Sequence, residues 1–161
     1  MAKKTKSKDI LLVAVDFTSF SKKAVLFAGN LADKLDAQLL VLHVIHDPAE
    51  APGFYVQKGK KKKYLASMEE AAEEMMTEFL ENLRQAFPAD KVIKNAVPML
   101  VVGTPAMRIV EVAKKEKAGM IIVGSHGRTG LSKIMIGSKA ERVVRLSTIP
   151  VIVVKSAEKN N

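Results

Sequence analysis

The fold is decided by the stretch Ile10-Leu11-Leu12-Val13-Ala14-Val15-Asp16. Six consecutive apolar residues are too few for a helix, but they suit a β-strand that is buried on both faces, as in parallel sheets. Asp16 ends the run, and Thr18 or Ser19 can cap a helix that begins directly behind it. A buried strand followed at once by a helix predicts the first unit of an α/β domain.

The same alternation of strand and helix continues along the chain. Further strands are predicted at residues 39–45, 96–102, 120–123 and 150–154, and helices at residues 64–87, 104–117 and 138–146. Pro98 indicates that the strand containing it lies at a sheet edge. We therefore expect one domain over residues 1–161 with flexible tails at 1–8 and 156–161, built as a doubly wound, five-stranded parallel sheet with helices on both faces.

Composition narrows the class of protein. A chain of 161 residues with 48% hydrophobic residues suits a single soluble domain. No apolar run reaches the roughly 20 residues needed to cross a bilayer, so no membrane association is expected. The chain contains no cysteine, which excludes a disulfide framework. The short apolar run behind the lysine-rich start does not fit a secretory signal, so we expect a cytoplasmic protein.

The net charge of +9 is confined to two segments. Residues 1–8 and 58–63 contain nine lysines and no acid, so the rest of the chain is formally neutral. Such runs are usually solvated, and nucleic-acid binding is therefore not expected. An alternative for Lys60–Lys63 is an anion-attracting lid, because the loop predicted from His46 to Lys63 leaves the second strand close to Val44.

A glycine-rich loop carries the chemistry. It reads Gly124-Ser125-His126-Gly127-Arg128-Thr129-Gly130, and Gly137-Ser138 opens the next helix. Glycine permits positive φ and close backbone approach, and free amides at 124, 127 and 137, together with a helix start, would neutralise a polyanion such as phosphate. In open parallel sheets ligands bind at the carboxyl ends of the strands, where Asp16 and Val44 also lie. Because a carboxylate repels phosphate, Asp16 would instead contact ribose hydroxyls or a divalent metal.

The familiar nucleotide fingerprints are absent. Val15-Asp16-Phe17-Thr18 contains no glycine, so the first turn is not a dinucleotide-binding loop, and the chain has no G-x-x-x-x-G-K-[ST] sequence. The phosphate loop predicted here follows the fourth strand instead.

The spacing Gly124-x2-Gly127-x9-Gly137-Ser138 resembles the nucleotide signature of the ATP-binding branch of the universal stress proteins. The likeness covers nearly the whole chain, including the opening strand, Leu42-His43-Val44-Ile45, and 137–143. It implies strand order 3-2-1-4-5, a homodimer, and ATP, ADP or AMP as ligand, with Mg²⁺ as an optional companion. By this resemblance Asp16 faces the ribose or the metal, and Val44 offers its backbone to the adenine edge. The implied binding set is Ala14, Val15, Asp16, Val44, Gly124, Gly127, Arg128, Gly137, Ser138, Lys139 and Ala140.

Two positions depart from that family pattern. Lys139 stands where members often have a small or β-branched residue, and it can add a phosphate contact or crowd the pocket. Ala14 stands where members that bind ATP often have proline, which affects loop stiffness more than chemistry.

Several of these residues also have plainer interpretations. Asp16 can simply cap the first helix, and His43, inside an apolar strand, is expected to be a core histidine satisfied by the protein. His126 can contact ligand from the loop. With three scattered histidines and no cysteine, a transition-metal site is not expected.

The sequence thus favours an adenine-nucleotide-binding stress-response protein that acts as a sensor or switch. Because no nucleophile–base pair stands out near the loop, catalysis is expected to be limited to slow ATP hydrolysis at most. A dimeric scaffold without nucleotide and an ATP-dependent ligase or transferase remain alternatives. In the order 3-2-1-4-5, Val151–Val154 forms an apolar edge strand, and pairing with a second copy across a two-fold axis would cover it.

Overall fold

The computed structural model describes residues 9–47, 60–126 and 136–155. The strands are β1 (Ile10–Ala14), β2 (Gln38–Ile45), β3 (Val97–Val102), β4 (Ala118–Gly124) and β5 (Val151–Val154), and the helices are α1 (Ser19–Leu35), α2 (Lys60–Ala86), α3 (Lys91–Lys94), α4 (Pro105–Lys115) and α5 (Ser138–Leu146). All the strand pairs are parallel, and the sheet order is β3-β2-β1-β4-β5. The predicted fold and strand order are confirmed.

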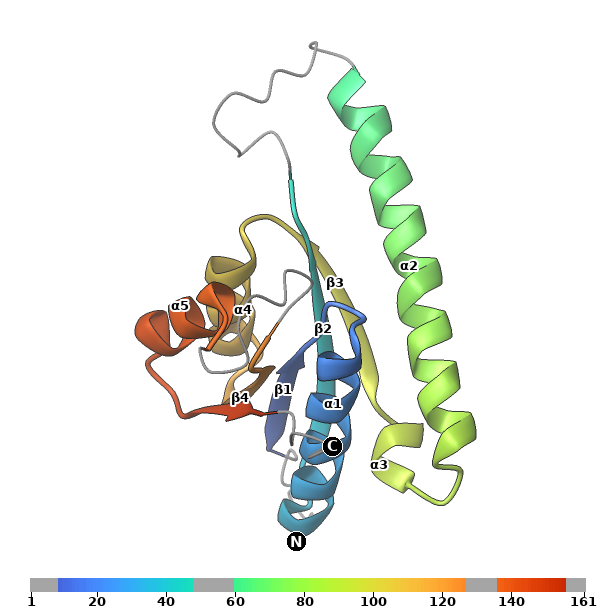
Figure 1. Ribbon diagram of the computed structural model, residues 1–161, viewed down its shortest axis with the longest axis vertical. Helices are drawn as coiled ribbons and strands as arrows, with labels where there is room; N and C mark the ends of the chain where they lie inside the picture. Colours follow the sequence, from blue (N-terminus) through green and yellow to red (C-terminus); the bar gives the residue numbers. More distant parts are fainter. Residues whose placement is uncertain (1–8, 48–59, 127–135, 156–161) are drawn as a thin grey trace, which may run out of the picture.

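Helices cover both faces of the sheet (Figure 1). One hydrophobic core lies between the sheet and α1, α2 and α3, and a second lies between the sheet and α4 and α5. β1 occupies the centre, and its Leu12 and Val13 are completely buried. This explains the uninterrupted apolar run, because successive side chains of a central parallel strand enter the two cores in turn.

The two sheet edges agree with the sequence. β3, which contains Pro98, pairs with β2 alone, and β5 pairs with β4 alone. An edge position tolerates proline because its missing N–H need not serve a second neighbour. Both edge strands are only partly buried along their lengths.

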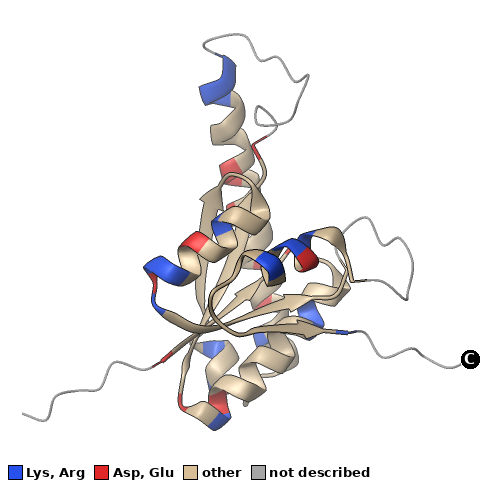
Figure 2. Cartoon of the chain, turned by 90° about the vertical axis from the view of Figure 1, so that its left-hand side faces the viewer, with Lys and Arg blue, Asp and Glu red and all other residues tan. Residues whose placement is uncertain are grey.

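The loop predicted to extend to Lys63 ends earlier than expected, because helix α2 already begins at Lys60. Lys60–Lys63 form the first turn of α2, since lysine is a good helix former, and the ammonium of Lys61 lies 3.1 Å from the carboxylate of the buried Asp47. In the cartoon of Figure 2 the beginning of this helix, which these lysines form, is blue and lies away from the sheet. The intervening residues 48–59, including Lys58, lie outside the described residues.

A short helix, α3, was not predicted. The Asp90 carboxylate accepts hydrogen bonds from the amides of Val92 and Ile93, both at 3.0 Å, and so caps it. Ile93 is completely buried against α1, where a Cβ added to Gly29 would lie 3.2 Å from it. Within the described segments, no helix is long and apolar enough to span a bilayer.

Candidate functional site

The turn after β1 is tied to the start of α1 through Asp16. Its Oδ1 accepts hydrogen bonds from the Thr18 amide at 3.2 Å, the Thr18 hydroxyl at 2.6 Å and the Ser21 hydroxyl at 2.5 Å. The Asp16 amide in turn donates to Ser21 Oγ at 2.8 Å. Thr18 is the N-cap of α1, and its hydroxyl accepts from the Ser21 amide. Asp16 therefore helps to fix the helix start, as one of the interpretations of the sequence expected.

Phe17, at the centre of this turn, has a left-handed backbone with φ of 65°. Its ring lies 4.3 Å from the His43 ring and 5.7 Å from the Phe79 ring of α2, measured between centroids. His43 Nδ1 is 2.8 Å from the Val15 carbonyl oxygen, so Nδ1 carries a hydrogen and donates it. The expectation that His43 is satisfied within the protein is confirmed.

Val44 presents backbone groups beyond the end of β1. The Leu42 carbonyl accepts from the Val15 amide at 2.8 Å, whereas the Ile45 carbonyl accepts from the Gly103 amide on the other side at 2.9 Å. Backbone groups of successive residues in a strand point to opposite sides. The N–H and carbonyl of Val44 therefore point toward the β1 side, past the residue where β1 has ended.

Gly124 ends β4 and pairs with Val154. A Cβ added to it would lie 3.4 Å from the backbone of Phe20, so this glycine allows β4 to pack closely on the first turn of α1. Gly124 itself does not have a positive φ, since Gly103 is the sole glycine with positive φ among the described residues; of the two properties expected of glycine, Gly124 provides the close backbone approach. Ala14, also half-buried, lies beside Val123.

Ser125 links the end of β4 to the start of α5. It is almost fully buried, its amide donates to the Val154 carbonyl at 2.9 Å, and its own carbonyl accepts from the Gly137 amide at 2.7 Å. Its hydroxyl lies 2.9 Å from Nδ1 of His126, whose ring lies 5.3 Å from that of Phe20. The Gly137 amide is thus engaged within the protein, which corrects the expectation that it is free for an anion.

The next amides, those of Ser138, Lys139 and Ala140, occupy the first turn of α5. The first intrahelical bond of this helix runs from the Glu141 amide to the Gly137 carbonyl at 3.0 Å. The three amides before it have no acceptor inside the helix, and Gly137, the N-cap, offers no side-chain cap. This positive helix end carries the exposed Lys139 and is suited to an anion.

The sheet brings most of the predicted binding residues to its carboxyl edge. The ends of β1, β2 and β4 meet there with the start of α5, linked by the bonds of His43 and Ser125. Gly127 and Arg128 lie outside the described residues. Sequence reasoning missed Phe17 and Ser21, whose roles depend on contacts formed only in the fold. Within the described ranges no three His, Asp or Glu side chains gather as metal ligands.

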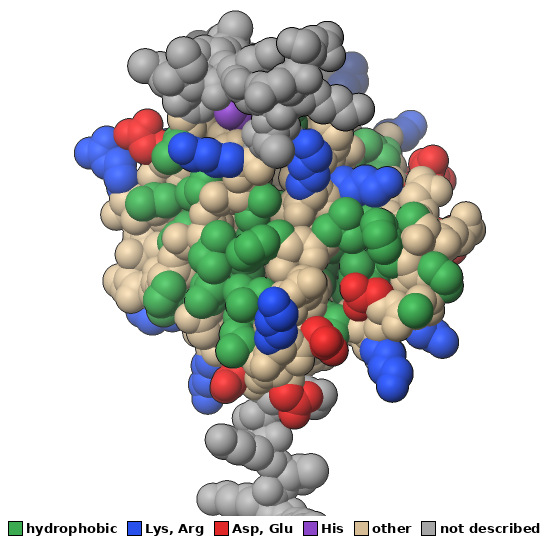
Figure 3. Space-filling view, turned by 60° about the horizontal axis from the view of Figure 1, so that its bottom comes forward, with side chains coloured by type: hydrophobic (Ala, Val, Ile, Leu, Met, Phe, Trp, Pro, Cys, Tyr) green, Lys and Arg blue, Asp and Glu red, His purple; other side chains and the backbone are tan. Residues whose placement is uncertain are grey.

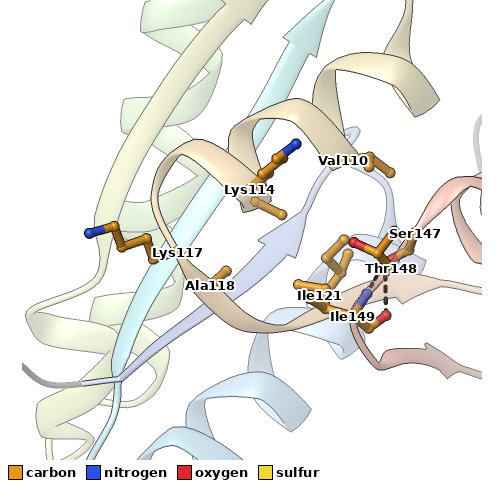
Figure 4. Close-up of a pocket in the computed structure, with 9 residues that line it drawn as sticks. Val110, Lys114, Lys117, Ala118, Ile121, Ser147, Thr148 and Ile149 are labelled. Carbon is orange, nitrogen blue, oxygen red and sulfur yellow. Dashed lines mark hydrogen bonds between the residues drawn. The ribbon is translucent and has the colours of Figure 1, made fainter.

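A cavity of about 310 Å³ lies at the opposite, amino edge of the sheet. Its walls come from the last turns of α4, the beginning of β4 and the connection from α5 to β5 (Figure 4). The Ser147 hydroxyl closes this connection by bonding to both backbone groups of Ile149. This cavity is therefore separate from the predicted phosphate-binding residues.

Residues 8–155 match the universal stress protein family, and the chain belongs to this family. It is 32% identical to Universal stress protein MJ0531 of Methanocaldococcus jannaschii, across 92% of this chain and 83% of that protein. It is 31% identical to Universal stress protein YxiE of Bacillus subtilis, across 90% of this chain and 97% of that protein.

Solved structures share the fold. Universal stress protein UspA from Lactobacillus plantarum superposes with a TM-score of 0.73 at 23% identity, covering 94% of this chain and all of that chain. A universal stress protein from Archaeoglobus fulgidus, solved in complex with dAMP, gives a TM-score of 0.58 at 21% identity over 93% of this chain and all of that chain. A different solved structure, of a universal stress protein in complex with cAMP, gives a TM-score of 0.62 at 21% identity over 94% of this chain and all of that chain.

Proposed function

We propose that this protein binds an adenine nucleotide at the carboxyl edge of the sheet and acts as a homodimeric sensor or switch in the stress response. The start of α5 is the observation that carries the proposal. The amides of Ser138, Lys139 and Ala140 have no acceptor within the helix, the N-cap Gly137 has no capping side chain, and Lys139 adds a positive charge. A phosphate group would satisfy both the amides and the charge.

The adenosine part of the ligand would lie between the ends of β1 and β2. Val44 directs its N–H and carbonyl into the space past β1, which suits the donor and acceptor edge of adenine. Val15 and Asp16, at the turn after β1, would border the same space. Family members with the same fold that were solved with cAMP and dAMP support an adenine nucleotide as the ligand.

The proposal assigns Asp16 mainly to the geometry of the turn. Three hydrogen bonds converge on its Oδ1, and a metal bound there would compete with them. We infer that Mg²⁺, where it accompanies ATP, is held chiefly by the phosphates and water. Rapid turnover is not part of the proposal, and slow hydrolysis is its upper limit.

The nucleotide proposal is tested on freshly purified protein. Acid extraction followed by chromatography identifies any carried ligand, and calorimetry measures the affinity for ATP, ADP and AMP. Gly127→Val should abolish binding, whereas Gly119→Val should leave it unchanged. Gly119 is the matched control because it lies at the opposite edge of the sheet, where an added Cβ would have its nearest neighbour at 3.9 Å. An empty extract together with no heat from any of the three nucleotides would refute nucleotide binding.

The homodimer proposal concerns the free edge of β5. The Pro150 carbonyl accepts a hydrogen bond from the Ile121 amide of β4, and the Val154 carbonyl accepts one from the amide of Ser125, the residue after β4. Because successive residues of a strand direct their backbone groups to opposite sides, those of Val151 and Val153 point away from the sheet. Exposed hydrophobic residues also flank this half of the molecule, such as Val144 and Leu146 of α5. Figure 3 shows hydrophobic side chains gathered in broad patches on one face.

Pairing of β5 with the same strand of a second copy would satisfy these outward groups. Val153→Pro removes one outward N–H without removing a bond to β4. We expect light scattering to give a dimer for the unmodified protein and a folded monomer for Val153→Pro. A monomer for the unmodified protein at micromolar concentration would refute the dimer.

A scaffold without nucleotide is the second candidate, and a specific observation favours it. The Gly137 amide is already bonded to Ser125, so part of the glycine signature serves the fold itself. A dimer that releases no nucleotide and binds none would support this function instead.

A further inference from the structure

We propose that Phe17 is a positioning residue through which helix α2 controls the nucleotide site. This inference rests on the proposed function and adds a regulatory element to it. Phe17 itself need not touch the ligand, because it acts on the turn that carries Asp16 and on the adjoining carbonyl of Val15.

The backbone of Phe17 adopts an unusual conformation. Its φ of 65° lies in the left-handed region, which bulky residues rarely adopt and glycine adopts freely. The bonds from the Thr18 amide and hydroxyl to Asp16 Oδ1 close a turn around this residue. The conformation of Phe17 therefore sets where Asp16 lies relative to β1.

Two aromatic rings hold Phe17 in that conformation. Its ring packs on the His43 ring at 4.3 Å and meets the Phe79 ring edge-on at 5.7 Å with an interplanar angle of 66°. His43 is anchored by its bond to the Val15 carbonyl, and the Phe17 side chain packs against the core beneath α1 and α2. The strained turn is thus held by a stack of three rings whose last member belongs to α2.

Helix α2 is attached to the rest of the domain mainly through its second half. Its buried residues begin only at Ala72, and its first turns extend past the sheet (Figure 1). Besides the Phe79 contact, Lys61 binds Asp47, two residues after the end of β2. The helix therefore contacts both segments that border the adenine end of the site, the turn after β1 and the residues after β2.

Through these attachments the position of α2 and nucleotide binding are coupled, and any such coupling is reciprocal. A change in the position of α2 would alter the turn at Phe17, and nucleotide that fixes this turn would favour one position of α2, with the same free energy of coupling in both directions. A partner that binds the protruding part of α2 would then have a different affinity for the nucleotide-bound and nucleotide-free forms.

The test compares Phe79→Ala with Leu83→Ala, a matched truncation one turn further along α2. Leu83 is buried in the core against which the partly buried Phe79 packs. We expect Phe79→Ala to raise the Kd for ATP by roughly tenfold, within the usual range of couplings. Leu83→Ala should lower the stability at least as much but leave the Kd within about twofold of the unmodified protein. Equal effects of the two truncations on the Kd would overturn the coupling.

Substitution of Phe17 itself separates the turn from general stability. Phe17→Ala keeps the unfavourable φ and loses the ring stack, whereas Phe17→Gly removes the strain and can keep the turn. We expect Phe17→Gly to bind ATP more tightly than Phe17→Ala. Equal or weaker binding by Phe17→Gly would contradict the positioning role.

A readout without nucleotide distinguishes failure of the coupling from failure of the proposed function. The amides of Asp16 and Thr18 both donate hydrogen bonds within the turn, so their hydrogen exchange reports its integrity. Phe79→Ala should accelerate their exchange and Leu83→Ala should not. If the unmodified protein binds no nucleotide, the proposed function fails, and this exchange pattern alone decides whether α2 holds the turn.

Discussion

Replacing Gly137 with aspartate should stabilise the protein while it abolishes tight nucleotide binding. Gly137 is the N-cap of α5, with φ of −59° and ψ of 145°, a conformation that every L-residue tolerates. An aspartate there would accept a hydrogen bond from an amide of the first turn, which in other helices gains a few tenths of a kcal/mol over glycine. Its negative charge at the positive helix end adds about 0.3–1 kcal/mol.

The stability gain therefore amounts to about 0.5–1.5 kcal/mol, from the cap and the dipole together. In a domain of this size each kcal/mol shifts the Tm by roughly 2–4 °C. The same carboxylate would occupy the amides that the phosphate needs and repel it. We expect the Kd for ATP to rise at least about tenfold, which is 1.4 kcal/mol. Calorimetry gives the Kd, and thermal unfolding followed by circular dichroism gives the Tm.

Gly137→Asn is the matched control, because asparagine caps the helix with a neutral group of the same shape. It should stabilise the protein less and weaken ATP binding less than aspartate does. If Gly137→Asp leaves the Kd within twofold of the unmodified value, phosphate does not bind at the start of α5. If it lowers the Tm, the amides of the first turn already have partners in the free protein.

Three further substitutions test the frame around the site. Gly103→Ala should lower the free energy of unfolding by about 1–3 kcal/mol in a denaturant titration, since φ of 141° is strained for any side chain; an unchanged midpoint would contradict that backbone conformation. Lys61→Met should cost about 0.5–1 kcal/mol, because it removes an ion pair in which the lysine side chain is 48% exposed, while the exposed Lys62→Met should cost less than about 0.5 kcal/mol. Asp16→Ala should cost about 1–3 kcal/mol by depriving three donors of their acceptor, and a loss equal to that of Asp16→Asn would show that the charge, not the acceptor, matters.

The fold could be predicted well where local pattern decides it. The apolar run at 10–15 and the proline in the third strand correctly indicated a central strand and an edge strand. The bounds of α5, Ser138–Leu146, agreed with the structure. The order of the strands in the sheet could not be predicted from local pattern. It came only from the resemblance to a family. Periodicity reveals which residues are buried, but not which strands are neighbours.

The site was harder to predict because long-range contacts define it. The bond from His43 to Val15 joins residues 28 apart in the chain, and no local pattern reports such a pair. Glycine posed a second problem, since it offers both positive φ and a missing side chain. Gly124 uses only the missing side chain, against Phe20, and the sequence does not reveal which property a fold exploits. The helical turn at Lys60–Lys63 was not predicted, because no Ser, Thr, Asp or Asn stands directly before it as an N-cap.

The hydrogen bond between Ser125 and Gly137 has a consequence for how this protein can vary. It joins the two residues that flank residues 126–136. The entropic cost of bringing these two ends together is therefore offset within the protein and not by a ligand. Substitutions, and even small insertions, between the two anchors would then leave β4 and α5 in place. Such an arrangement would let related chains acquire different ligands on one unchanged frame.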